Sequence, residues 1–240
     1  MMADDKLVGV IGGMGPDATV DFMAKVIAMT PAHSDQEHVR MLVAHNPRIP
    51  SRQHAMQGSG EDPGPAIAAT ARQLEKAGAD FLVMPCNAAH GWRDDVIAAT
   101  SIPFISIIEE SASAAIHADL EGGPVGILTT PACFSAGLYQ HELAARQREI
   151  VMQSPEELAE TMSLIDRIKA GDQSEQVTEG LLELSEQLVT RGAAVIIAAC
   201  TELPLVLEQS MFDVPLVSST DALAMKTVDL ALGNEPLPNR

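Results

Sequence analysis

The chain has 240 residues, of which 15 are basic and 33 acidic, so its formal net charge at pH 7 is −18. This length supports one large domain or two smaller ones with apolar cores. Because so acidic a protein repels phosphate backbones, we predict that it binds no nucleic acid. No apolar stretch approaches the roughly 20 residues that cross a bilayer, and the chain does not open on a secretory leader pattern. We therefore expect a cytoplasmic protein that does not contact a membrane.

The predicted elements alternate between short apolar runs and longer amphipathic stretches, which is typical of an α/β fold. Several runs are continuous Val, Ile and Leu, as in strands that are covered on both faces of a parallel sheet. The predicted strands are Lys6–Ile11, Val39–His45, Asp80–Pro85, Pro103–Ile108, Val125–Thr129, Ile150–Met152, Ala194–Ala199 and Pro215–Ser218. The predicted helices are Asp17–Met29, Pro65–Ala77, Trp92–Ala99, Glu109–Asp119, Ser135–Arg146, Pro155–Lys169, Glu175–Thr190, Leu203–Gln209 and Asp221–Leu232. The Pro-rich and Gly-rich segment Asn46–Pro65 predicts a long functional loop.

The chain also repeats itself. Three pairs of segments align at nearly the same spacing: Leu74–Cys86 with Leu188–Cys200, Ile102–Ser106 with Val214–Ser218, and Val8–Ile11 with Val125–Leu128. This predicts two similar α/β domains, the first formed by residues 1–105 and about 216–240 and the second by residues 106–215. Chance is the alternative, because units of helix, glycine and strand resemble one another.

A glycine-rich turn follows the first predicted strand, in Gly9–Ala18. Its pattern Gly13-x-Gly15-x-x-Ala18 loosely fits a dinucleotide-binding fingerprint. That fingerprint also needs an acid at the end of the second strand to bind the ribose, and Ala44–Pro47 contains none. We therefore favour a small-anion or turn-forming role.

Three cysteines, Cys86, Cys133 and Cys200, are too few and too widely spaced for a disulfide scaffold or a Cys-x-x-Cys metal or redox site. Cys86 and Cys200 each follow a predicted strand at equivalent points of the repeat, where open α/β sheets place ligand crevices. Each also precedes a predicted helix start, which lowers a thiol pKa from roughly 8.5 toward neutrality. Burial as packing residues is the alternative. Four histidines cluster in the sequence: His33, His38, His45 and His54. Their spacing matches no metal-binding pattern, so we expect no metal site.

Two opposed thiols could remove the α-proton of an amino acid and return a proton to the opposite face. Five motifs occur in order along nearly the whole chain: Ile11–Pro16, Asp35–His38, Asn46–Arg52, Pro85–His90 and Cys200–Pro204. Together they resemble the aspartate/glutamate racemase family, and the two Cys motifs are the most specific part. The resemblance implies two α/β domains with mainly parallel sheets related by a pseudo-twofold axis and a site in the cleft between them. It also implies a cofactor-independent two-base mechanism and a homodimer.

Residue by residue, the resemblance implies that Cys86 and Cys200 are the catalytic thiols. It implies that Arg52 and Lys169 hold the substrate carboxylates, and the forked guanidinium suits that task. Without the resemblance, Arg52 would be a solvated loop residue and Lys169 a helix C-terminal cation. The other residues that it places at the substrate are Met14, Asn87, Thr130 and Thr201.

Two residues depart from the family pattern. Ala88 and Cys133 stand where family members usually have threonine, which removes two hydroxyls from the expected site. Racemase chemistry is therefore better supported than aspartate specificity, and we interpret Cys133 as a packing residue or an indirect neighbour of the site. His90 and Glu202 could tune the adjacent thiols, or be a buried hydrogen-bonding residue and a first-turn helix acid.

We therefore predict a racemase that interconverts the L- and D-forms of an acidic amino acid, with aspartate ahead of glutamate and no cofactor. Pyridoxal phosphate is not implied, because no lysine lies in a Schiff-base context. The alternatives are a decarboxylase or isomerase of small dicarboxylates, a cysteine hydrolase that uses Cys86, and a sensor of acidic ligands that performs no catalysis.

Overall fold

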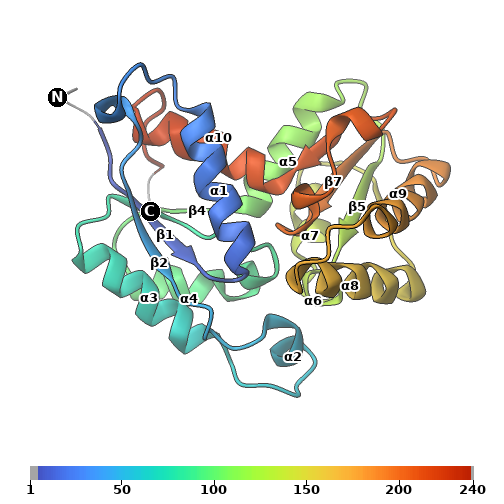
Figure 1. Cartoon of the computed structure of the whole chain (residues 1–240), viewed down its shortest axis with the longest axis horizontal. Helices are drawn as coiled ribbons and strands as arrows, with labels where there is room; N and C mark the ends of the chain where they lie inside the picture. The colour runs from blue at the N-terminus through green and yellow to red at the C-terminus, as the bar shows by residue number, and fades with distance from the viewer. Residues whose placement is uncertain (1–4, 239–240) are drawn as a thin grey trace. The chain divides into compact units, whose positions relative to one another are not determined.

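The computed structural model describes residues 5–238, and its chain divides into two α/β units (Figure 1). Unit 1 comprises the chain up to Ile107 and from Thr220 onwards, and unit 2 comprises Ile108–Ser219. Each unit contains one sheet of four parallel strands. The predicted α/β class with parallel sheets is therefore confirmed.

The sheet of unit 1 has the strand order β2-β1-β3-β4. Its strands are β1 (Val8–Gly12), β2 (Met41–His45), β3 (Phe81–Val83) and β4 (Phe104–Ile105). The helices of this part of the chain are α1 (Pro16–Met29), η1 (Asp35–Glu37), α2 (Arg52–Met56), α3 (Gly64–Lys76), η2 (Ala88–Trp92), α4 (Arg93–Ala99) and α10 (Ser219–Ala231). The central strands β1 and β3 are buried along their whole length, as continuous apolar runs predict.

The sheet of unit 2 has the equivalent order β6-β5-β7-β8. Its strands are β5 (Val125–Thr129), β6 (Ile150–Met152), β7 (Val195–Ala199) and β8 (Leu216–Ser218). Its helices are α5 (Ile107–Ala118), α6 (Pro131–Ser135), α7 (Leu138–Ala145), α8 (Pro155–Lys169), α9 (Glu175–Thr190), η3 (Leu203–Leu205) and η4 (Gln209–Met211). All eight predicted strands are thus present.

The packing of the first strand in each unit confirms the internal repeat. A Cβ atom on Gly9 of β1 would lie 2.9 Å from the Cβ atom of Ala79, and one on Gly126 of β5 would lie 2.8 Å from that of Ala193. Ala79 and Ala193 occupy equivalent positions, each just before the third strand of its sheet. Both units therefore need a glycine at the same point for the same close approach.

The chain crosses between the units later than we expected. We expected the second domain to end at residue 215, but β8 pairs in parallel with β7 and therefore belongs to unit 2. The N–H of Ile196 also donates to the carbonyl oxygen of Pro215 at 2.9 Å. The return to unit 1 accordingly comes at Thr220, after the first residue of α10. The chain first leaves unit 1 after Ile107, which is likewise the first residue of a helix, α5.

Three local predictions were wrong. The helix predicted at Leu203–Gln209 is two short 3₁₀ turns, because Val206 leaves the helical conformation at φ −133°. The helix predicted at Ser135–Arg146 begins only at Leu138, because Gly137 has a left-handed φ of 65° that cannot continue an α-helix, and Ser135 instead ends α6. The loop Asn46–Pro65 contains the five-residue helix α2.

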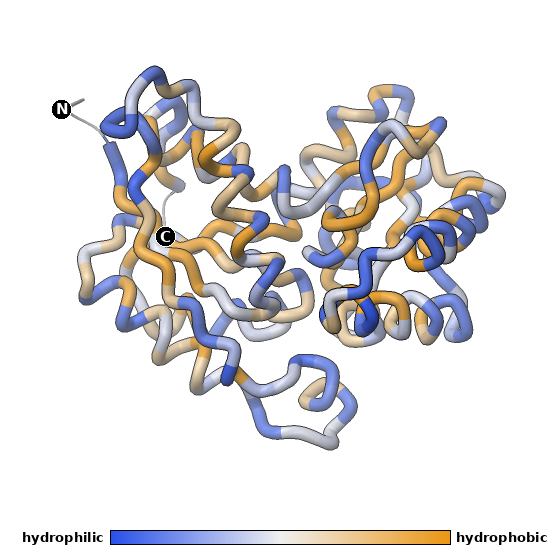
Figure 2. The backbone as a smooth tube through the Cα atoms, viewed as in Figure 1, coloured by the Kyte–Doolittle hydropathy of each residue, from blue (hydrophilic) through white to orange (hydrophobic). Residues whose placement is uncertain are grey.

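Each unit has its own apolar core, and Figure 2 shows the hydrophobic strands lying inside more polar helices. One core cluster of unit 1 includes Ile11 and Leu82, and that of unit 2 includes Leu128 and Ile196. Cys86 belongs to the first cluster and Cys200 to the second. Across residues 5–238, no helix combines the length and apolarity that spanning a bilayer requires.

Candidate functional site

In each unit a cysteine follows the third strand, at the carboxyl edge of the sheet. Cys86 lies three residues after the end of β3, and its N–H donates to the carbonyl oxygen of Met84 at 2.8 Å. Cys200 directly follows β7. Their exposed fractions are 7% and 8%, so both cysteines are buried. Ligands of open α/β sheets bind at this edge.

In unit 1, Cys86 lies in an apolar cluster that also contains Met14 and Ile49. Met14 follows the glycine turn, where Gly13 has a φ of +92°. A Cβ atom on Gly13 would lie 2.4 Å from the carbonyl carbon of Asn46, so only glycine fits. This turn therefore brings Met14 and the start of the Arg52 loop together beside the thiol.

The glycine turn is closed by hydrogen bonds of its own. The N–H of Gly13 donates to Thr19 Oγ1 at 2.8 Å, and that hydroxyl donates to the carbonyl oxygen of Gly15 at 2.8 Å. The N–H of Gly13 is therefore used within the turn, as a turn-forming role requires.

Two buried polar residues follow Cys86 in unit 1. Asn87 is 2% exposed and His90 is 1% exposed. His90 Nδ1 lies 2.9 Å from the carbonyl oxygen of Cys86, and Nε2 accepts a hydrogen bond from the N–H of Ile107 at 3.1 Å. Burial, the largest cause, lowers the His90 pKa to about 4. The imidazole is therefore neutral near pH 7, and both of its nitrogens are bound to main-chain groups.

Arg52 begins α2, on the loop that leaves the sheet after β2. Its Nη1 donates to the carbonyl oxygens of Ile49 at 3.0 Å and Pro50 at 2.7 Å. The side chain is half-buried. The guanidinium thus folds back on its own loop, which holds its position while part of the group remains exposed.

The far end of this loop is attached to the segment that follows Cys86. Asp62 Oδ1 accepts hydrogen bonds from Trp92 Nε1 at 2.7 Å and from the N–H of Gly64 at 2.9 Å. Trp92 is the last residue of η2. The Arg52 loop is therefore anchored at both ends within unit 1, on Ile49 and on Asp62. No sequence motif indicated the second anchor.

In unit 2, the Cys200 thiol donates a hydrogen bond to Glu202 Oε2 at 3.0 Å. The hydroxyl of Thr201 lies 3.5 Å from the same oxygen. All three residues are buried. The structure therefore forms a direct contact between the second thiol and a carboxylate.

The pKa of Cys200 is raised well above its ordinary value, first by burial and then by the negative charge of Glu202. The positive charge of Lys169 lowers this pKa, but not enough to reverse the shift. We expected a helix N-terminus to lower it, and that expectation was wrong here. The residues after Cys200 form a three-residue 3₁₀ turn, which provides no helix dipole to oppose burial. Cys200 is therefore a protonated thiol at neutral pH.

Lys169 reaches this site from the last turn of α8. The two isoleucines of that turn, Ile165 and Ile168, belong to the same apolar cluster as Cys200. The Lys169 side chain is 39% exposed and its Nζ lies 3.7 Å from Asp166 Oδ1. The buried side of α8 thus brings a solvent-facing cation within electrostatic range of the thiol.

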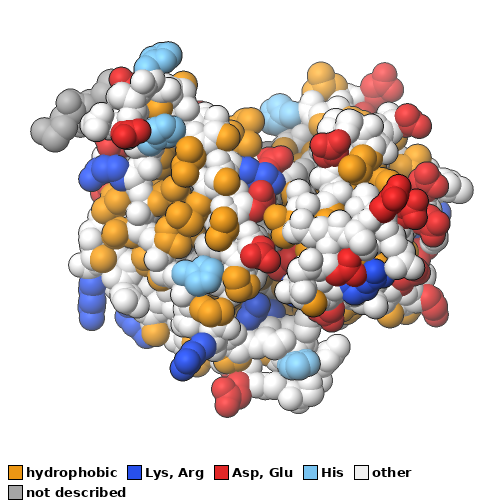
Figure 3. Space-filling model, in the orientation of Figure 1, with side chains coloured by type: hydrophobic (Ala, Val, Ile, Leu, Met, Phe, Trp, Pro, Cys, Tyr) orange, Lys and Arg blue, Asp and Glu red, His pale blue; other side chains and the backbone are white. Residues whose placement is uncertain are grey.

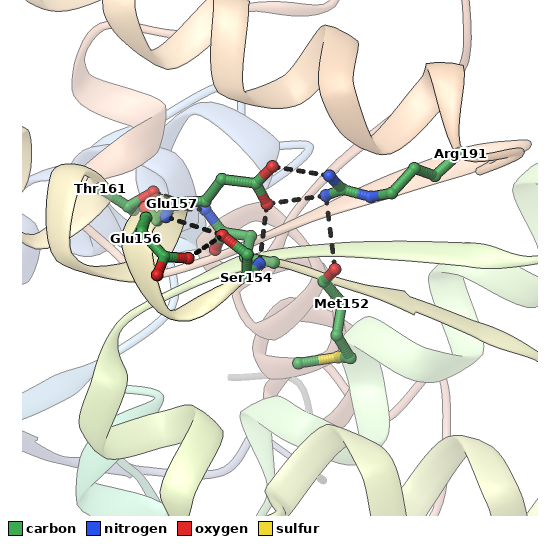
Figure 4. Close-up of polar contacts among 7 residues, drawn as sticks. Met152, Ser154, Glu156, Glu157, Thr161 and Arg191 are labelled. Atoms are coloured by element: carbon green, nitrogen blue, oxygen red, sulfur yellow. Dashed lines mark hydrogen bonds and ion pairs between the residues drawn. The ribbon is translucent and has the colours of Figure 1, made fainter.

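The start of α8 is fixed by a polar cluster (Figure 4). Ser154 and Glu157 form a capping box, in which each side chain accepts a hydrogen bond from the other's main chain. Arg191 donates two hydrogen bonds to Glu157, at 2.6 and 2.8 Å, and one to the carbonyl oxygen of Met152. The hydrogen bond from Arg191 lowers the pKa of Glu157. The N-terminus of the helix that carries Lys169 is therefore held by several hydrogen bonds.

Thr130 and Cys133 lie at the end of β5, next to β7. Thr129 pairs with Ala199 in register, so Thr130 and Cys200 follow neighbouring strand ends. Thr130 caps α6 by accepting the N–H of Cys133 at 3.3 Å. The Thr130 hydroxyl therefore serves first as a helix cap, while Cys133 is buried at 1% exposure.

Tyr139 is a neighbour of this site that the sequence did not reveal. Its phenol is buried and forms a hydrogen bond with Ser111, and its pKa is raised by burial and by Cys133 and Cys200. It lies on α7, outside every motif, and a single tyrosine in a predicted helix carries no pattern that would identify it. Within the part of the chain that the structure describes, no group of three or more His, Cys, Asp or Glu could hold a metal.

Comparison with known proteins gives consistent similarities. The sequence profile described as Asp/Glu/Hydantoin racemase matches residues 11–227. The broad specificity amino-acid racemase RacX of Bacillus subtilis is 30% identical over 231 residues, which cover 94% of this chain and 98% of RacX. The Picrophilus torridus aspartate racemase structure has a TM-score of 0.84 at 30% identity and covers 97% of this chain and 96% of its own. Glutamate racemase from Francisella tularensis, in complex with D-glutamate, shares the fold with a TM-score of 0.71 at 18% identity, over 99% of this chain and 85% of its own.

Proposed function

Because the chain belongs to the Asp/Glu/hydantoin racemase family, we propose that it interconverts the L- and D-forms of an amino acid with two thiols and no cofactor. The observation that carries this proposal is the duplicated placement of Cys86 and Cys200. Each thiol follows the third strand of its sheet at the equivalent position of the repeat. A packing role would not require a cysteine at both positions.

In the proposed reaction, one thiolate removes the α-proton and the other thiol donates its proton to the opposite face of the same carbon. One C–H bond breaks, another forms, and the two sulfurs exchange protonation states. This route requires Cys86 and Cys200 to reach opposite faces of one substrate. Proton transfer by a positioned group contributes about 10²- to 10⁴-fold to a rate.

The two thiols do not start from the same state. Cys200 is a protonated thiol that donates to the Glu202 carboxylate, so we assign it as the proton donor of the resting enzyme. In the opposite direction Cys200 must first lose this proton, and Glu202 is the acceptor within reach. Glu202 is therefore proposed as the partner that converts Cys200 from acid to base.

The substrate carboxylates are assigned to the two cations. Arg52 would hold one carboxylate through its forked guanidinium, and Lys169 would hold the other. In a chain with a net charge of −18, an anionic substrate depends on such placed cations. Four further residues are assigned to the amino group, the carboxylates or the apolar wall of the site: Met14, Asn87, Thr130 and Thr201.

Aspartate is our first candidate substrate and glutamate the second. Neutral amino acids are an alternative, which the similarity to a broad specificity racemase favours together with Ala88 and Cys133. If these two residues relax the preference for acidic substrates, the double substitution Ala88→Thr and Cys133→Thr should raise the kcat/KM ratio of aspartate over alanine. An unchanged ratio would exclude them as determinants of specificity.

The test is incubation with L- and D-aspartate, glutamate and a panel of neutral amino acids in D₂O, following α-deuteration and optical rotation together. We expect deuterium to enter as the stereocentre inverts, and both Cys86→Ser and Cys200→Ser to lose inversion. A Cys200→Ser variant that racemises like the parent would refute the two-thiol mechanism. A covalent acyl-enzyme on Cys86, decarboxylation, or binding without exchange would instead identify one of the alternative functions.

The proposal also includes an oligomeric state and a cellular location. We propose a homodimer, as the family resemblance implies, and a cytoplasmic location. Light scattering coupled to gel filtration checks the first, and fractionation of the source cells checks the second. A monomeric mass at micromolar concentration would refute the dimer.

A further inference from the structure

His90 has one protonation pattern that satisfies both of its neighbours. The carbonyl oxygen of Cys86 can only accept a hydrogen bond, and the main-chain N–H of Ile107 can only donate one. Nδ1 must therefore carry the hydrogen, and Nε2 must present its lone pair. Protonation of Nε2 would break the bond to Ile107.

The surroundings keep this imidazole neutral. Its pKa is lowered to about 4 by burial and by the charge of Arg93, although the bond to Cys86 opposes this shift. The Phe104 ring packs beside it with the two ring centroids 5.3 Å apart. A group held in this way is poorly suited to receive a proton from the neighbouring thiol.

Three segments of unit 1 meet at this ring. Cys86 belongs to the turn after β3, Phe104 belongs to β4, and Ile107 is the first residue of α5. The N–H of a first helical residue has no partner inside its helix, so His90 supplies it from outside. The equivalent position of unit 2 is Pro204, whose side chain has no hydrogen-bonding group.

We propose that His90 is a positioning residue that fixes the main chain of Cys86, and thereby the direction of its thiol, without exchanging protons with it. The importance of that thiol rests on the proposed function. A misplacement of about 1 Å at a reacting group can reduce the rate by about 100-fold. Loss of the Nδ1 hydrogen bond should therefore lower kcat by about 10- to 100-fold and leave KM nearly unchanged.

The substitutions His90→Asn and His90→Gln separate the two hydrogen bonds. Asparagine can place an N–H near the Nδ1 position and keep the bond to Cys86. Glutamine can place an oxygen near the Nε2 position and keep the bond to Ile107. If positioning of Cys86 is what matters, Asn should retain more kcat than Gln, and both should retain more than Ala. Equal kcat values for Asn and Gln would refute the assignment.

A readout that needs no substrate distinguishes this inference from the proposed function. The alkylation rates of Cys86 and Cys200 by iodoacetamide are measured in the same sample by peptide mass spectrometry. We expect His90→Ala to change the rate of Cys86 severalfold while the rate of Cys200 stays within about twofold. Parallel changes of both thiols would indicate general loosening of the fold and refute the proposal. The ratio is informative even if no amino acid is racemised.

A measurement on the parent protein covers the case in which His90→Ala does not fold. Nitrogen-15 NMR of the labelled imidazole should show Nδ1 as the protonated nitrogen and Nε2 as the unprotonated one throughout pH 5.5 to 8. A ring that titrates within that range, or the opposite tautomer, would overturn the inference.

Discussion

The two units share one sheet topology but differ in the segment that carries each proposed substrate cation. In unit 1, Arg52 begins the short helix α2 on a polar loop anchored by Ile49 and Asp62. In unit 2, Lys169 ends α8, a helix of 15 residues with a capping box and an apolar face in the core. Both segments lie between the second and third strands of their sheets. The two sheets therefore have the same strand order, whereas the segments that connect their second and third strands differ.

The surroundings of the two thiols differ as well. The position two residues after the thiol is Ala88 in unit 1 and Glu202 in unit 2, and the position four residues after it is His90 in unit 1 and Pro204 in unit 2. One thiol is held by a neutral imidazole through the main chain, and the other contacts a carboxylate directly. Two equivalent strand ends thus place the two thiols in different surroundings.

The surfaces of the two units differ in the side chains that they show on one face. On the face drawn in Figure 3, acidic side chains are spread over the helices of unit 2, whereas unit 1 shows a broader apolar area. The large apolar side chains that are exposed among residues 5–238 are divided equally between the units: Val20, Ile27 and Met225 in unit 1, and Leu120, Val189 and Met211 in unit 2.

The largest effect is expected for Glu202→Gln. Without the carboxylate, the proton of Cys200 loses its acceptor, and we expect kcat to fall by about 100-fold. The negative charge of Glu202 raises the Cys200 pKa, so its removal should also make Cys200 alkylate faster at pH 7 while Cys86 is unchanged. Glu183→Gln removes the same charge from an exposed position on α9 and should alter neither measurement. Equal alkylation of Cys200 in parent and variant would contradict the assigned contact.

The second effect is a dependence of stability on pH that arises in unit 1. His90 has a folded-state pKa of about 4 against an ordinary value of 6.5, so between these values the unfolded chain binds more protons. Its contribution to stability is present above pH 6.5 and is lost as the pH falls towards 4. The loss is about 3 kcal/mol in the free energy of unfolding.

Urea unfolding at several pH values between 4 and 7 measures this slope. His90→Asn should unfold with a shallower pH dependence than the parent, because asparagine does not titrate. Carboxylates that titrate in the same range contribute equally to both proteins and cancel in the comparison. Identical slopes would show that His90 is not held neutral.

The third effect concerns the hydrogen bonds between Arg191 and Glu157 at the N-terminus of α8. Arg191→Met removes two charge-assisted hydrogen bonds from Glu157, and we expect the free energy of unfolding to fall by about 1–2 kcal/mol. The Glu157 pKa, which Arg191 lowers, should rise towards its ordinary value. Arg72→Met removes an exposed cation from α3 and serves as the control. A loss no larger than in this control would show that the anchor contributes nothing.

The smallest effect is expected for the anchor of the Arg52 loop. Asp62→Ala removes the acceptor of the Trp92 indole, and an exposed hydrogen bond of this kind contributes about 1 kcal/mol or less. Thermal stability should therefore be nearly unchanged, while the fluorescence of Trp92, the single tryptophan, shifts. Asp62→Asn keeps an acceptor oxygen and should restore the parent spectrum. Unchanged fluorescence in Asp62→Ala would mean that the loop end is not anchored there in solution.

Much of this protein was determined by the sequence alone. Continuous apolar runs gave all eight strands because a strand buried on both faces tolerates few polar residues. The caps and turn signals were equally local, so α8 was predicted with its observed bounds, Pro155–Lys169. The spacing of the repeat located Cys86 and Cys200 at equivalent strand ends. Motifs of the family supplied the proposed roles of Arg52 and Lys169, which no local pattern would have revealed.

The tertiary structure decided the contacts between segments that lie far apart in the chain. Only the fold shows that the two nitrogens of His90 join Cys86 to Ile107, or that Tyr139 lies near Cys133 and Cys200. The protonation of Cys200 also depends on burial, which raised a pKa that a helix start was expected to lower. Hydrogen bonding and desolvation are properties of the packed environment of a group, and a linear sequence specifies that environment only once it has folded.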